Sequence, residues 1–170
     1  MGKYIFNPYN PKFKDLFNKE KSKLKKILPN NTKIEHVGST AVPGLGGKGI
    51  IDIVIKTPRE KRDQFMKKID GLGYKSNLEH PGNNKRIFFQ KIIRYAGKER
   101  LAHIHLVLNN EFWDSFIVSR DYLRKHDKER KEYAKIKKEA VRHAKGEGKK
   151  YRKYKDKFLH NLTKKALKTK

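Results

Sequence analysis

The sequence of 170 residues contains no cysteine, which excludes disulfide bonds, thiolate zinc sites and a cysteine nucleophile. It also has no apolar run of bilayer-spanning length, and its first residues lack the apolar segment of a signal peptide. We therefore expect a cytoplasmic protein that does not enter a membrane. Hydrophobic residues make up only 35% of the chain, but eight Tyr, nine Phe and one Trp suffice for a core.

Acidic residues are scarce, with 18 Asp and Glu against 44 Lys and Arg and a net charge of +26. Residues 111–170 hold 21 basic and 9 acidic residues, leaving 23 and 9 for residues 1–110. The excess is thus spread along the chain instead of forming a basic tail. Such a field favours a polyanion, above all RNA, as partner. A lysine-rich proteome or a thermophile's charged surface would give the same composition.

Residues 34–55 form the most informative stretch, IEHVGSTAVPGLGGKGIIDIVI. A short apolar run meets Gly38 and Ser39, a glycine-rich passage follows as far as Lys48, and a second apolar run is interrupted only by Asp52. Burying a carboxylate among β-branched residues is costly unless it is paired, and a divalent cation with substrate phosphates is the simplest partner. The Gly-Ser pair would turn backbone N–H groups toward an anion. We interpret the stretch as a phosphate-binding turn facing a metal-binding aspartate.

Hydrophobic periodicity predicts both strands and helices, as in an α+β chain. The chain from residue 111 onward is predicted to be helical, with a break near residues 146–148. We expect a core over residues 1–110 and a helical part over 111–170 packed on it as one compact unit. The expected strands are 34–37, 50–55, 86–94 and 101–108, and residues 4–6 are expected to form a short strand or an extended arm. The expected helices are 12–28 and 59–70, with a loop at 75–84 and a hairpin turn at 96–98.

Strand alternation decides which polar side chains can meet. Asp52 lies on the polar side of a strand whose other side is all isoleucine, and His103 and His105 share the polar side of theirs. If both strands bury their apolar sides under the same helices, the three groups open on one face of the sheet. We predict that they converge, close enough to share a cation or a water molecule. The alternative is one packed and one half-exposed histidine.

A set of motifs is spread along the chain, at residues 9–11, 35–45, Lys48, 51–53, 103–105, 120–124, Tyr133, Lys137, Tyr151, Lys155 and Phe158. Together these motifs resemble the GrpB family of bacterial and archaeal proteins. The resemblance covers nearly the whole chain and implies a fold of the nucleotidyltransferase superfamily, a small mixed sheet flanked by helices. In that superfamily a Gly-Ser turn follows one strand and metal-binding carboxylates lie on the next.

One position departs from the superfamily pattern. Its usual Asp-x-Asp places a second acid where this chain has Val54, and a two-metal mechanism normally needs several carboxylates. His103, His105 or Glu35 could replace the missing acid, although histidine suits manganese or zinc better than magnesium.

Two hypotheses about function follow from the sequence, one for an enzyme and one for a binding module. The first is an enzyme that transfers a nucleotidyl group from a nucleoside triphosphate, with Mg or Mn, to an unknown acceptor such as RNA. Gly38 and Ser39 would hold the phosphates, and Lys48 and Arg120 would neutralise their charge. Asp52 would bind the metal, and the two histidines would complete its shell or act as general base. The second hypothesis is a nucleotide- or RNA-binding module on the same fold without turnover.

Other residues near these motifs have structural interpretations. Trp113 and Phe116 are expected in the core rather than in a base-stacking platform. For His36, packing beside the Gly-Ser turn and a functional role are both open.

Overall fold

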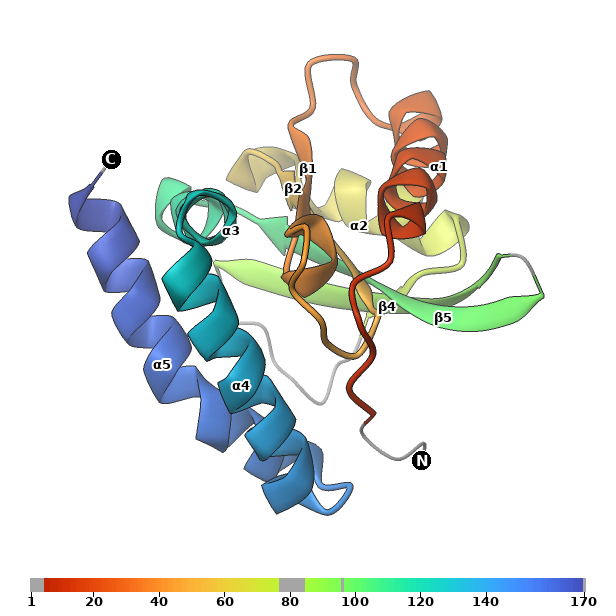
Figure 1. The fold of residues 1–170 in the computed structure, drawn as a ribbon. Helices are drawn as coiled ribbons and strands as arrows, with labels where there is room; N and C mark the ends of the chain where they lie inside the picture. Colours follow the sequence, from red (N-terminus) through yellow and green to blue (C-terminus); the bar gives the residue numbers. More distant parts are fainter. Residues whose placement is uncertain (1–4, 77–84, 96, 170) are drawn as a thin grey trace.

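The computed structural model describes residues 5–76, 85–95 and 97–169. Its centre is a five-stranded sheet with strand order β1-β2-β5-β4-β3 (Figure 1). β2 and β5 are parallel, and the other neighbours are antiparallel, so the sheet is mixed as predicted. The strands are β1 Ile34–Val37, β2 Ile51–Lys56, β3 Lys75–Ser76, β4 Arg86–Tyr95 and β5 Lys98–Val107.

The two helices predicted before residue 111 are confirmed to within a few residues, the second opening with a 3-10 turn. The helical C-terminal part is confirmed as well, and its break at residues 146–148 separates α4 from α5. A second break, at His126, was not predicted. The helices are α1 Lys12–Ile27, α2 Arg62–Gly71, α3 Asn110–Lys125, α4 Asp127–Ala144 and α5 Gly148–Lys168, with 3-10 turns η1 Ser39–Ala41 and η2 Arg59–Lys61.

Some expectations of local structure need correction. The expected loop at 75–84 opens with the edge strand β3, and residues 77–84 lie outside the described residues. Of the two alternatives for residues 4–6, residues 5 and 6 form no strand, which leaves the extended arm, and Tyr4 is outside the described part. Asn7, directly after them, forms an isolated antiparallel bridge with Gly47. The hairpin is confirmed by the pairing of Tyr95 with Lys98, although Ala96 lies outside the description.

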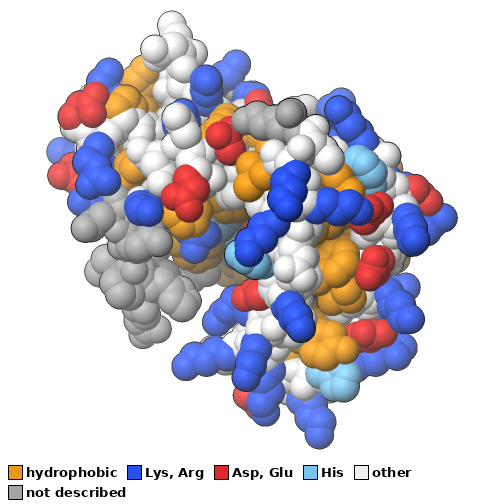
Figure 2. Space-filling model, turned by 90° about the vertical axis from the view of Figure 1, so that its left-hand side faces the viewer, with side chains coloured by type: hydrophobic (Ala, Val, Ile, Leu, Met, Phe, Trp, Pro, Cys, Tyr) orange, Lys and Arg blue, Asp and Glu red, His pale blue; other side chains and the backbone are white. Residues whose placement is uncertain are grey.

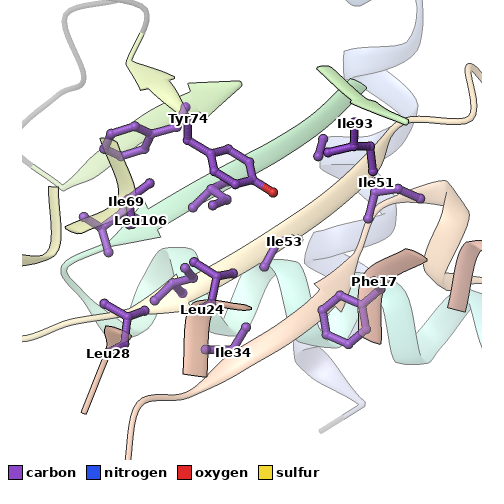
Figure 3. Close-up of a cluster of buried hydrophobic side chains, with 14 of the residues drawn as sticks. Phe17, Leu24, Leu28, Ile34, Ile51, Ile53, Ile69, Tyr74, Ile93 and Leu106 are labelled. Atoms are coloured by element: carbon purple, nitrogen blue, oxygen red, sulfur yellow. The ribbon is translucent and has the colours of Figure 1, made fainter. Parts of the chain in front are cut away.

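The main core fills one face of the sheet beneath α1 and α2. Isoleucines of β2, among them Ile51 and Ile53, are fully buried there against side chains such as Leu24 and Ile69 (Figure 3). One polar pair crosses this core, because the buried Tyr74 hydroxyl donates a hydrogen bond of 2.8 Å to the Glu20 carboxylate. The alternation of β2 thus puts its isoleucines inside, as expected.

The opposite face of the sheet is covered in part by α3. Val54 is fully buried there, and Trp113 and Phe116, both partly buried, pack against the same cluster. The α4 and α5 helices lie side by side (Figure 1). A further cluster joins Val42 and Leu45 to side chains of the three C-terminal helices, so these helices wall the turn region that follows β1. No helix of the described part is long and apolar enough to cross a membrane.

Candidate functional site

Asp52 meets both histidines on the α3 side of the sheet. The parallel register of β2 and β5 sets Asp52 opposite His103 and Val54 opposite His105. The Oδ1 atom of Asp52 lies 3.2 Å from Nδ1 of His103 and 3.7 Å from Nε2 of His105. The predicted convergence of the three side chains is therefore confirmed.

The electrostatics of this group keep Asp52 ionised. Burial by itself raises the pKa of Asp52, but the adjacent imidazoles of His103 and His105 outweigh it and hold the pKa well below its usual range. Burial lowers the pKa of His105, which is therefore neutral at pH 7. The side chain of Asp52 is 22% exposed, so the carboxylate is within reach of a ligand. The Nδ1 atom of His105 is buried and has no hydrogen-bond partner within the described residues.

The Gly-Ser turn lies directly against this carboxylate. Gly38 has φ +71° and ψ −169°, a conformation that is essentially restricted to glycine. A Cβ atom on Gly38 would stand 2.3 Å from Oδ2 of Asp52. Both observations explain why the chain has glycine here, and they place the predicted phosphate-binding turn beside the aspartate.

Ser39 and Lys137 both lie against Gly47 of the glycine-rich segment. A Cβ atom on Gly47 would stand 2.6 Å from the Ser39 Oγ and 2.5 Å from the Lys137 Nζ, so both groups border one glycine. The buried ammonium of Lys137 donates a hydrogen bond of 2.6 Å to the Gly46 carbonyl. Burial, assisted by the charges of nearby lysines and opposed by Asp52, lowers the pKa of Lys137 to about 7.

Lys48 lies in the same field of charges. Burial first, then Lys155 and Arg152, lowers its pKa to about 8, while Asp52 acts in the opposite direction. Its ammonium lies 4.3 Å from the centre of the Tyr151 ring. We call Lys48, Lys137, Arg152 and Lys155 the cationic cluster.

Sequence reasoning assigned a site role only to Lys48 within this cluster. Lys137, Arg152 and Lys155 belong to α4 and α5, whose packing on the turn was not predicted in detail. A signal for Lys137 was present, because it shares a helical stripe with Tyr133, Ala140 and Ala144, all of them buried. A lysine on an apolar stripe indicates either a buried site or a side chain that extends its charge to the surface.

Arg120 has its guanidinium bound to protein groups. It donates to Glu35 at 2.7 Å, to Asp121 at 2.8 Å and to the His36 carbonyl at 3.0 Å. Burial lowers its pKa, but the bonds to the two carboxylates raise it more. These contacts tie α3 to β1, and they place Glu35 with Arg120. A phosphate-binding role for Arg120 stays a prediction.

His36 has a packing role. Its ring stacks on Phe17 with centroids 4.7 Å apart, and its Nε2 lies 3.0 Å from the Thr40 hydroxyl. That hydroxyl donates its only proton to the Ile50 carbonyl, so Nε2 of His36 is the donor in the first bond. Burial lowers the pKa of His36 to about 4, which keeps the ring neutral. The side chain thereby holds the turn against β2.

The residues do not form a complete metal site by themselves. Within the described ranges, no group of three or more His, Asp or Glu side chains is arranged to hold a metal ion. Val54, two residues beyond Asp52, is fully buried and adds no carboxylate. Asp52 can still provide one ligand to a cation held mainly by phosphates, which is how magnesium is commonly bound with nucleotides.

Comparison with known proteins identifies the family. The family described as GrpB protein matches residues 4–165. The chain belongs to the GrpB family. It is 36% identical over 135 residues to the UPF0157 protein PA4798 of Pseudomonas aeruginosa, covering 79% of this chain and 55% of that protein. It is also 36% identical over 134 residues to the UPF0157 protein YqkA of Bacillus subtilis, covering 77% and 38%.

The chain thus spans about half or less of the length of these two curated relatives. A solved GrpB structure from Enterococcus faecalis is similar over 97% of this chain and 98% of that one, with a TM-score of 0.83 and 30% identity. The Cid1 poly(U) polymerase is a distant neighbour, with a TM-score of 0.47 and 15% identity over 77% of this chain and 45% of that one. The resemblance to GrpB proteins drawn from the motifs is confirmed.

Proposed function

We propose that the Asp52 site binds a nucleoside triphosphate and transfers its nucleotidyl group to an acceptor. The observation that carries this proposal is the contact between Gly38 and Asp52 beside a cationic cluster. The cluster suits phosphates, whereas the ionised carboxylate would repel them. A triphosphate that arrives with a divalent cation satisfies both, because the cation offers the carboxylate a partner.

The phosphate contacts follow from the arrangement of the site. Ser39, Lys48 and Lys137 would bind phosphate oxygens, and the backbone at Gly38 would turn its N–H groups toward them. Lys137 is about half protonated near pH 7, since its pKa is about 7. An incoming anion would favour its protonated form. Mg²⁺ or Mn²⁺ bound to the nucleotide would take Asp52 as a ligand and neutralise phosphate charge.

His103 is the residue that we assign as general base. Its Nδ1 donates to Asp52, which leaves Nε2 as the proton acceptor of an imidazole oriented by a carboxylate. In the step, a hydroxyl oxygen of the acceptor bonds to the α-phosphorus and the bond to the bridging oxygen breaks. Pyrophosphate leaves, and the hydroxyl proton passes to Nε2 of His103. His105, with its neutral and more deeply buried ring, would help to hold Asp52 in place.

RNA is the acceptor that the charge favours. α5 carries nine Lys and Arg residues and a single acid, Asp156. Arg152 and Lys155 of this helix belong to the cationic cluster, so its basic surface leads into the site. Lys and Arg side chains cover much of the face on the α5 side of the molecule, with fewer Asp and Glu among them (Figure 2). A strand lying along this helix would release counterions and bring its end toward Asp52.

The second candidate is nucleotide binding without turnover. The burial of Val54 favours it, because the side chain is sealed beneath α3 where catalytic relatives of the superfamily would carry an acid. Phosphate binding by the cationic cluster does not depend on that position.

Calorimetric titration with each nucleoside triphosphate, with Mg²⁺, Mn²⁺ or neither, tests binding. Transfer is tested by incubating the protein with α-³²P-labelled nucleotides and total RNA and measuring label in RNA. We expect metal-dependent binding and label transfer, both abolished by Asp52→Asn. The matched control Asp70→Asn changes an exposed acid of α2 that pairs with Lys75 and should change neither. Binding without transfer supports the second candidate. Equal results for the two variants would overturn the catalytic role of Asp52 and also leave the second candidate in its place.

A further inference from the structure

A second concave site lies beside β1, an outer strand of the described sheet. It is a groove of about 440 Å³ between α1, the turn after β1 and the start of α4. Its lining shares no residue with Asp52, its histidines, the Gly38-Ser39 pair or the cationic cluster. The volume falls in the range of small-molecule sites, about 300–1,000 Å³. The polar and charged side chains of its lining include Tyr9, Lys14, Asn18, Glu35, Arg120 and Arg124.

One wall of this groove carries two arginines whose guanidinium groups are held by hydrogen bonds to the protein. Arg124 donates to the Ala41 carbonyl through Nε at 2.9 Å and through Nη2 at 2.8 Å. Its Nη1 has only a long contact of 3.5 Å with Asp121, so that end of the fork keeps donors for a ligand. Arg120 is held by Glu35 through its Oε2 atom. These bonds position the guanidinium groups before any ligand binds.

The front of the groove carries polar groups that the protein does not use. Among the described residues, the side chains of Lys14 and Asn18 make no hydrogen bond or ion pair, and the Tyr9 hydroxyl makes no hydrogen bond. The Tyr9 hydroxyl, the Lys14 ammonium and the Asn18 amide can therefore donate hydrogen bonds to a ligand in the groove, as can Nη1 of Arg124. The carboxylate of Glu35 adds an acceptor to the same wall.

We propose that this groove binds a small phosphomonoester that also carries hydroxyl groups. A phosphomonoester holds about −1.5 to −2 charges at pH 7 and three strong acceptor oxygens. Lys14, Tyr9 and the free end of Arg124 supply donors for those oxygens, and the planar fork of arginine suits phosphate. A hydroxyl group of the ligand donates to Glu35. The proposal is independent of any reaction at Asp52.

The test uses ribose 5-phosphate as probe and ribose as the control without phosphate. We expect saturable calorimetric binding of the phosphate ester and none of ribose. Lys14→Gln should weaken binding about tenfold or more, since it removes a hydrogen bond between charged groups. Lys12→Gln removes the same charge from an exposed position on the same helix outside the groove and should have at most about a twofold effect.

Location is tested by NMR of the side-chain amide of Asn18 in ¹⁵N-labelled protein. We expect this signal to shift on titration, and to shift equally in Asp52→Asn protein, even if no nucleotide binds there. Absence of saturable binding, equal weakening by Lys14→Gln and Lys12→Gln, or an unmoved Asn18 amide would overturn the proposal.

Discussion

Gly38 and Asp52 are in such close contact that no other residue fits at position 38. A Cβ atom there would stand 2.3 Å from the Asp52 Oδ2, and the backbone has φ +71°. We expect Gly38→Ala to destabilise the protein by about 2–4 kcal/mol, combining backbone strain with overpacking. Gly146→Ala is the control, because Gly146 also has positive φ but a Cβ would meet nothing within 4 Å. It should cost about 1 kcal/mol. Urea unfolding measures both, and equal costs would contradict the contact.

Lys137 makes stability depend on pH. Its pKa is lowered from 10.5 to about 7 in the folded protein, so between these values the unfolded chain binds more protons. Stability should therefore rise with pH above 7. We expect Lys137→Met to remove about 2 kcal/mol of the rise between pH 7 and 9. The control Lys135→Met changes an exposed residue of the same helix and should leave the rise intact. Urea unfolding at several pH values measures the free energy of unfolding of the parent protein and of both variants.

Val54→Asp tests whether a second acid, two residues beyond Asp52, can be added to the site. Because Val54 is fully buried under α3, an unpaired carboxylate there should cost about 3–5 kcal/mol. Val54→Ala, which only leaves a cavity, should cost about 2 kcal/mol. Thermal or chemical unfolding compares the two. A stable Val54→Asp protein with improved metal binding would show that the position opens to the site, against the packing described.

RNA binding should depend steeply on salt and on α5. The logarithm of the association constant should fall linearly with the logarithm of salt concentration, with a slope of about −0.7 for each phosphate neutralised on a single strand. Replacing Arg152 and Lys155 by Gln should make that slope less negative by about 1.4, because two phosphate contacts are lost. The control replaces Lys25 and Lys26, exposed on α1, and should preserve the slope. Fluorescence anisotropy measures it, and equal slopes for all proteins would exclude α5 as the RNA surface.

The sequence predicts the sheet well because apolar residues form a nearly continuous run in β2 and alternate with polar ones in β5. It places Asp52, His103 and His105 on one face, but their distances depend on the register of two parallel strands, which local pattern does not set. The break at His126 was not predicted, since no Gly or Pro marks it. There the His126 N–H bonds the Tyr122 carbonyl four residues earlier and its ring stacks on that of Tyr122, local contacts that involve no residue type typical of a helix end.

Lys137 shows a different limit. The helical spacing of Lys137 with apolar residues of α4 can be read from the sequence. Its nearness to Ser39 cannot, because it depends on how α4 packs on the glycine-rich segment. That docking involves an apolar cluster drawn from residues far apart in the chain. Arg120 shows the reverse case: its place in a motif of the family favoured a role in the site, but long-range contacts with β1 occupy its guanidinium.

Those contacts of Arg120 have a consequence for association between molecules. Among the described residues β1 is an outer strand that pairs with β2 alone, so its other side could accept a strand from another chain. The guanidinium of Arg120 binds the carbonyl of His36 in β1 and brings a charge to that strand. A strand approaching β1 would have to displace this bond and bury the arginine. We therefore expect Arg120 to disfavour edge-to-edge association of the sheet.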